Sequence, residues 1–215
     1  MSAETIYTYL YVLPRGELRK ELLSYLRQHH KKRRPRSRGE DRRGQIPEMI
    51  SIEERPAEVA ERIVSGHWEG DLIMGEGNRT ALGILVERTT RTTLLVPLKA
   101  KDAESVRKAF AKRLRAIPKQ MKLSMTYDRG KEMAEHKLFT SETKMKVYFA
   151  HPKNPWERGT NENTNGLIRQ YFPKGTDFSE VSYYMIMKAR DRLNGRPRKV
   201  LGWKTPYEAF NELLH

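Results

Sequence analysis

The chain has 215 residues, of which 37% are hydrophobic and 32% charged, so it can form one packed domain with an appendage but contains no membrane-spanning apolar run. Its lack of cysteine excludes disulfides, thiol catalysis and cysteine-held zinc. A net charge of +15 predicts a polyanionic partner such as nucleic acid, with a merely soluble basic surface as the alternative. The first residues lack the layout of a secretory signal, so we expect a cytosolic protein.

The first 65 residues divide into two predicted parts. Residues 1–30 carry leucines and aromatic residues at helical spacing, which predicts two short helices at 2–11 and 17–28. Residues 31–65 predict a basic linker followed by a brief helix at 56–63, because eight of the first thirteen residues of this segment are Lys or Arg and such a run repels itself. Whether this run contacts a phosphate backbone or is only solvated stays open.

Residues 66–215 form the third and largest predicted domain. Short apolar runs separated by turn residues predict strands, and longer runs with a period of 3.6 predict helices. The predicted strands are 67–74, 81–88, 92–98, 121–128 and 146–150, and the predicted helices are 103–116, 131–142, 179–193 and 205–214. Three antiparallel strands followed by helix-separated strands predict an α/β fold, with a mixed five-stranded sheet flanked by helices.

A loop at 154–159 leads into a further predicted helix. The Asn-Pro pair that opens the loop disfavours helix, and Thr160 or Asn161 is suited to cap the helix that comes next. On this helix Glu162 lies away from the apolar stripe that faces the core. A carboxylate presented there is a candidate metal ligand, although surface glutamates near helix starts are common because the helix dipole favours them.

Three acidic residues form the candidate site. Asp71 lies in the first predicted strand, Asp128 ends the fourth, and Glu162 lies on the helix after the fifth. If the first and fourth strands are neighbours, the two aspartates meet at the centre of the sheet and the helix can bring Glu162 beside them. Three carboxylates so close repel one another unless a cation lies among them, and oxygen ligands favour Mg²⁺. Two such ions would serve phosphodiester chemistry on nucleic acid.

Three segments carry a resemblance to a known family, and they span residues 66–73, 126–134 and 154–175. They resemble the catalytic motifs of bacterial insertion-sequence transposases of the IS-thirty family, in which the second aspartate and the glutamate have the 33-residue separation found here. That family belongs to the DDE superfamily and has the ribonuclease-H-like fold shared by retroviral integrases. The resemblance covers about residues 2–213.

The resemblance implies that Asp71, Asp128 and Glu162 are the catalytic residues and hold Mg²⁺, for which Mn²⁺ substitutes. It implies cleavage of an element's ends and their transfer into double-stranded target DNA, by a homodimer or larger oligomer at the bacterial nucleoid. Residues 1–30 then correspond to part of a helical DNA-binding region, because 2–11 resembles only the last helix of the family's helix-turn-helix module. The alternative function is a truncated, non-transposing DNA-binding relative that inhibits the full-length enzyme.

Other side chains near these motifs have competing interpretations. Glu69 shares a strand face with Asp71, and the resemblance favours Asp71 as the ligand. We expect Glu132 and Glu135 to be solvated and Glu157 to lie on the surface. We interpret His67 and His151 as ordinary strand-end histidines, with metal-site support or DNA contact as the alternative, and Trp68 as a core residue, with a role in shaping the site as the alternative. The candidate DNA contacts are Arg129, Lys153, Trp156, Arg158, Arg169 and Lys174. For Trp156, core packing stays open beside stacking on an unpaired base.

Overall fold

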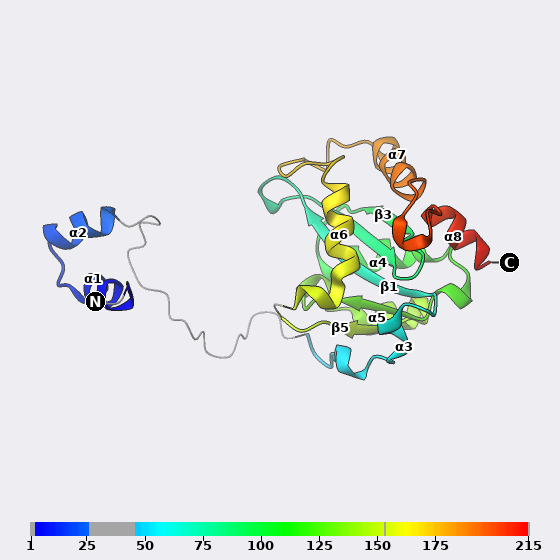
Figure 1. Ribbon diagram of the computed structural model, residues 1–215, viewed down its shortest axis with the longest axis horizontal. Coiled ribbons are helices and arrows are strands. Elements are labelled where there is room, and N and C mark those ends of the chain that lie inside the picture. The colour runs from blue at the N-terminus through cyan, green and yellow to red at the C-terminus, as the bar shows by residue number, and fades with distance from the viewer. Residues whose placement is uncertain (1–2, 26–45, 153, 215) are drawn as a thin grey trace. The chain divides into compact units, whose positions relative to one another are not determined.

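The computed structural model describes residues 3–25, 46–152 and 154–214 (Figure 1). The chain divides into two compact units, Met1–Arg43 and Gly44–His215. In the first unit, α1 (Ala3–Val12) and α2 (Glu17–Ser24) are two short helices, as the sequence predicts. Among the described residues of this unit Leu10 is the one buried side chain, so the two helices enclose almost no core.

The second unit is built on a five-stranded sheet. Its strands are β1 (His67–Met74), β2 (Ala81–Glu87), β3 (Thr93–Pro97), β4 (Ser124–Tyr127) and β5 (Lys146–Phe149). Their order across the sheet is β3-β2-β1-β4-β5. The β1–β2 and β2–β3 pairs are antiparallel, whereas β1–β4 and β4–β5 are parallel. The predicted mixed sheet is confirmed, and its first and fourth strands are neighbours.

Helices cover both faces of this sheet. They are α4 (Ala103–Leu114), α5 (His136–Thr143), α6 (Gly159–Ile168), α7 (Tyr183–Asn194) and α8 (Pro206–Glu212). Alternate residues of β2 enter different clusters, because successive side chains of a strand point to opposite faces. Leu85 packs with Phe110 of α4, and Ile84 packs with Ile186 of α7. Figure 1 shows α6 lying across one face of the sheet.

Some predicted boundaries differ from the observed ones. β4 begins at Ser124, three residues later than predicted, because Lys119–Met121 forms a 3₁₀ turn whose last carbonyl accepts the indole N–H of Trp68 at 2.8 Å. The helix predicted at 56–63 is shortened to α3 (Glu58–Glu61), since Arg62 adopts a left-handed conformation with φ 59°. No helix in the described parts of the chain is long and apolar enough to cross a membrane.

Residues 46–65, which the sequence analysis placed in the linker, pack with the second unit. The Phe149 amide donates to the Ile50 carbonyl at 2.9 Å, and Arg55 Nη1 donates to Thr126 Oγ1 at 2.9 Å. Ile46 is buried in the main core. This segment therefore extends the β5 side of the sheet, while the earlier part of the predicted linker lies outside the described residues.

Candidate active site

Asp71 and Asp128 lie close together at the junction of β1 and β4. In this parallel pair Glu69 stands opposite Thr126, so the two aspartates follow two residues farther along their strands. Asp71 accepts the Leu72 amide at 2.9 Å, and Asp128 accepts the Gly130 amide at 3.1 Å. The strand adjacency on which their predicted meeting depends is confirmed.

The guanidinium group of Arg158 lies between the two carboxylates. Its Nη1 is 3.5 Å from Asp71 Oδ1, and its Nη2 donates to Asp128 Oδ2 at 3.3 Å. Burial raises the pKa of Asp128, Arg158 acts against this rise, and the charge of Asp71 adds to it. The two like charges therefore share one cation, which here belongs to the protein itself.

One face of α6 is turned toward β1. Asn165 Nδ2 donates to Asp71 Oδ2 at 2.7 Å, and one turn later Arg169 Nη2 donates to the Met74 carbonyl at 2.8 Å. Residues three or four apart on a helix share a face, so these contacts show which face of α6 is directed toward the site. Arg169, predicted as a DNA contact, thus also ties α6 to the end of β1.

Glu162 lies on the same face of α6, four residues after Arg158 and three before Asn165. Its side chain is exposed. In the described part of the chain no three acidic or histidine side chains lie close enough to hold one ion together. The structure therefore brings Asp71 and Asp128 together and places Glu162 on the adjacent helix without joining it to them.

Glu69 is fully buried beneath the first turn of α6. Its Oε2 accepts the Asn161 amide at 2.9 Å, and its Oε1 lies 3.0 Å from Arg88 Nη1. Thr160 Oγ1 accepts a hydrogen bond from Arg91 Nη1 at 2.7 Å. The prediction that Thr160 or Asn161 caps the helix is wrong, since both residues lie inside it. The Asn161 amide, which has no partner within the helix, donates to the Glu69 carboxylate instead. Glu69 is therefore an anchor for α6.

Two glutamates expected to be solvated or on the surface are engaged with the protein. Glu132 is half-buried on the turn after β4, and burial raises its pKa, with the charge of Asp128 adding to the effect. Glu157 accepts the His151 amide at 2.7 Å and Asn154 Nδ2 at 3.1 Å, which orders the loop before α6. The prediction of a solvated side chain is wrong for Glu132, because the turn after β4 partly buries it, whereas Glu157, predicted to lie on the surface, is partly exposed but hydrogen-bonded.

Of the four remaining candidate DNA contacts, the structure describes the side chains of two. Arg129 Nε donates to the Ala150 carbonyl at 3.3 Å, and Lys174 is exposed. Lys153 and the side chain of Trp156 lie outside the described residues. DNA contact by these four residues stays a prediction.

Two aromatic residues of β1 have structural roles, as predicted. Trp68 is fully buried in the main core. His67 is also buried, and its Nδ1 lies 2.7 Å from Ser124 Oγ on the neighbouring strand. Burial lowers the pKa of His67, so it is a neutral strand-pairing residue at neutral pH. Neither residue belongs to the candidate site.

Comparison with known proteins agrees with this arrangement. Residues 61–155 match the Integrase core domain family. The chain is 51% identical over 214 residues to the transposase for insertion sequence element IS1086 of Cupriavidus metallidurans, covering 100% of this chain and 63% of that relative. It is 43% identical over 211 residues to transposase InsI for IS30A of Escherichia coli, covering 97% of this chain and 55% of the relative. The chain thus spans about three fifths of these relatives or less.

A solved structure with a similar fold is the catalytic core domain of BIV integrase. It has a TM-score of 0.55 at 19% identity, and the match covers 70% of this chain and 97% of that one. At this identity the match concerns the fold alone, which is the ribonuclease-H-like fold that the sequence predicts. The chain is therefore similar to the Integrase core domain over residues 61–155, and to IS30-type insertion-sequence transposases over nearly all of its length.

Proposed function

We propose that this protein is a DDE transposase, which cleaves DNA at the ends of an insertion sequence and joins those ends to target DNA with the help of divalent metal. The observation that carries the proposal is the sharing of one cation by Asp71 and Asp128, beside the helix that bears Glu162. The similarity to transposases supports DNA as the substrate.

The residues of the site fit a hard divalent cation. The carboxylates of Asp71, Asp128 and Glu162 offer oxygen, which is the ligand type that Mg²⁺ and Mn²⁺ prefer. Asn165 Oδ1 is buried and has no hydrogen-bond partner, so it is a further oxygen beside Asp71. The place now held by the guanidinium group already accepts positive charge between the two aspartates. Asp71, Asp128 and Glu162 would hold the metal.

The side chains of the site have distinct tasks in this proposal. When bound, divalent cations stabilise the charge that develops on the attacking and leaving oxygens at phosphorus. Asn165 keeps Asp71 oriented through its 2.7 Å hydrogen bond. Arg158 leaves the carboxylates and pairs with a DNA phosphate, for which its planar fork of donors is well suited. Glu162 then approaches by a change in its own side chain or in the first turn of α6.

The chemistry has two steps that break and form phosphorus–oxygen bonds. Water attacks the phosphodiester at the element end, so that one strand leaves with a free 3′-hydroxyl. That hydroxyl then attacks a phosphodiester of the target and releases a target 3′-hydroxyl. Both element ends must be held together, so the acting species is a homodimer or larger oligomer on DNA. The reaction takes place on the bacterial nucleoid in the cytoplasm.

A nicking assay tests this function. The full chain is incubated with supercoiled plasmid and with a duplex that mimics a pre-cut element end, in Mg²⁺, in Mn²⁺ and in EDTA. We expect nicked products and joined strands with either metal and none in EDTA. Asp128→Asn should abolish both products while leaving DNA binding intact, and Glu135→Gln, on the surface of the same unit, should leave them unchanged.

Two outcomes would overturn the proposal. If the unmutated chain binds DNA but yields no metal-dependent product, it is a binding protein and not an enzyme. If Asp128→Asn nicks as well as the parent chain, the nuclease activity belongs elsewhere or to a contaminant. Nicking without joined strands would make the protein a nuclease of this fold, and strand transfer would have to be withdrawn.

A further inference from the structure

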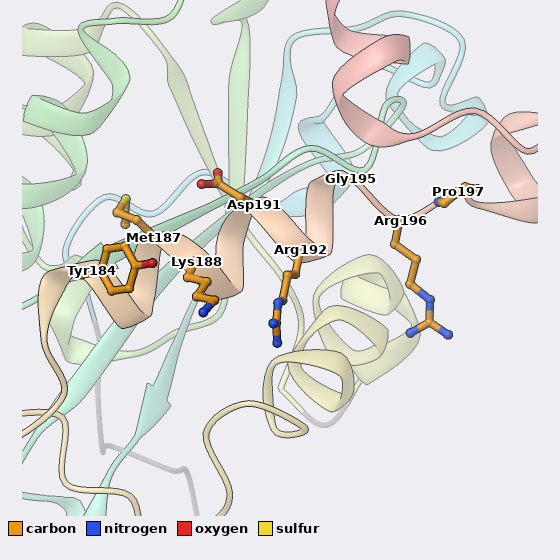
Figure 2. A pocket seen from close by; sticks show the side chains of 8 residues that line it. All are labelled: Tyr184, Met187, Lys188, Asp191, Arg192, Gly195, Arg196 and Pro197. Atoms are coloured by element: carbon orange, nitrogen blue, oxygen red, sulfur yellow. The ribbon is translucent and has the colours of Figure 1, made fainter.

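Helix α7 presents a row of three positive charges. Lys188 and Arg192 are four residues apart on α7, so their side chains are about 6 Å from one another and share a face, and Arg196 follows four residues later, beyond the C-cap Gly195. Arg196 lies just beyond the last residue of α7, and all three side chains are exposed. Figure 2 shows their charged ends extending to the same side. We call these three residues the α7 stripe.

The stripe is not neutralised by the acid nearest to it. Asp191 Oδ1 accepts Arg190 Nε at 2.8 Å and the Tyr207 hydroxyl of α8 at 2.5 Å. In Figure 2 the carboxylate of Asp191 points away from the stripe. Within the described residues, no member of the stripe forms an ion pair, and Lys188 Nζ lies 5.8 Å from the centre of the Tyr184 ring. The stripe therefore keeps its full positive charge.

The stripe also lies on a firm support beside an open groove. The opposite face of α7 is buried through Ile186, Ala189 and Leu193, which pack against β2, β3 and α6. The groove has a volume of about 790 Å³, and Met187 and Pro197 add apolar surface to its lining. Because the helix is held by the core, the backbone positions of Lys188 and Arg192 are set before any partner binds, which reduces the entropy that binding costs.

We propose that the α7 stripe binds the phosphate backbone of duplex DNA, as a contact surface separate from the candidate catalytic carboxylates. A row of cations without ion-pair partners complements a regular row of phosphates, and such contacts position DNA without reading its sequence. α7 packs against α6, which bears Glu162, so DNA held here lies next to the helix of the site. The choice of DNA rests on the proposed function, whereas the position of the surface does not.

Binding measurements on two matched variants test the stripe. One carries Lys188→Gln, Arg192→Gln and Arg196→Gln. The control carries Arg115→Gln, Lys119→Gln and Lys146→Gln, three exposed residues elsewhere on the same unit, and so loses the same charge. Affinity of the full chain for a labelled duplex is measured in EDTA over a series of salt concentrations. Three lost phosphate contacts should reduce the slope of log K against log salt by about 2.7, and the control should change it much less.

The outcomes separate this inference from the proposed function. If the slope of log K against log salt changes equally in the two variants, the α7 stripe contributes only through the net charge of the protein. If the slope is unchanged in the stripe variant, the stripe does not contact DNA. If polyglutamate of matched charge competes with the parent chain as well as duplex DNA does, the partner is acidic protein instead. Because EDTA prevents metal-dependent cleavage, a chain that never nicks DNA can still show the slope change, and circular dichroism confirms that both variants are folded.

Discussion

Glu69→Gln is the sharpest test of how the fold supports the candidate site. The carboxylate of Glu69 is fully buried, accepts the Asn161 amide at 2.9 Å and lies 3.0 Å from Arg88 Nη1. Glutamine keeps the size of the side chain and an oxygen that can accept the amide. It removes the charge that offsets Arg88, which is itself buried and whose pKa burial lowers. The substitution therefore isolates the electrostatic part of the anchor.

The expected loss of stability is large. Breaking a buried ion pair by removing one partner costs about 3–5 kcal/mol, since the other charge is left without compensation. For a unit of this size each kcal/mol lowers Tm by about 2–4 °C, so Tm should fall by roughly 6–20 °C. The first turn of α6 should also loosen, because its free amide loses a charged acceptor. DNA nicking should then fall at temperatures where the protein is still folded.

Thermal unfolding and hydrogen exchange measure these effects. We expect faster exchange at residues 159–163 of Glu69→Gln than of the parent chain. The control is Glu135→Gln, which breaks the 2.6 Å pair with Arg107 at a site where Glu135 is one-third exposed, and which should cost at most about 1 kcal/mol. If Glu69→Gln is no more destabilising than this control, Glu69 does not anchor α6. The double variant Glu69→Gln/Arg88→Gln should recover much of the loss, because it leaves no buried charge unpaired.

Three further predictions concern the site and the sheet. Burial raises the pKa of Asp128, so the folded state binds its proton more tightly and stability falls as pH rises above the ordinary value of 3.8. Asp128→Asn should therefore raise Tm at neutral pH but not at pH values below 3.8. Arg158→Gln should bind Mn²⁺ about fivefold more tightly by calorimetry, since displacing a unit charge costs about 1 kcal/mol even in water, and an unchanged affinity would contradict the shared-cation interpretation. Gly83→Ala places a methyl 2.4 Å from Phe110 Cε1 and should cost about 1–3 kcal/mol in urea unfolding.

The order of the first three strands follows from local features of the sequence, whereas the neighbour of β4 does not. Residues 81–86 are apolar without alternation, and β2 is buried along its whole length, which is what a strand covered on both faces requires. Short turns on either side of it favour antiparallel pairing with β1 and β3. Helices between the later strands allow parallel crossovers but do not decide beside which strand β4 lies, and the structure places β4 next to β1. The meeting of Asp71 and Asp128 is a consequence of that topology.

The contacts of α6 with β1 could not be predicted in the same way. Asn165 and Asp71 are 94 residues apart in sequence and are joined by a single side-chain hydrogen bond, which leaves no periodic signal. Helical spacing does place Arg158, Glu162 and Asn165 on one face. Helical spacing does not predict how far α6 lies from the sheet. Because of that distance, Arg158 reaches the aspartates while Glu162 stays exposed. Packing of the core sets this distance.

The competition between Glu69 and Asp71 shows how the fold separates two acidic side chains of the same charge. Strand alternation puts both carboxylates on one face of β1, so strand geometry alone does not distinguish them and only the resemblance favours Asp71. Glu69 meets Arg88 and a backbone amide in the interior, where its charge is satisfied permanently. Asp71 meets Asp128, a second acid, and the cation beside it is a side chain that is partly exposed to solvent. A carboxylate pair whose counter-ion can leave is the one that can exchange it for metal, and on that ground we propose Asp71 and not Glu69 as the ligand.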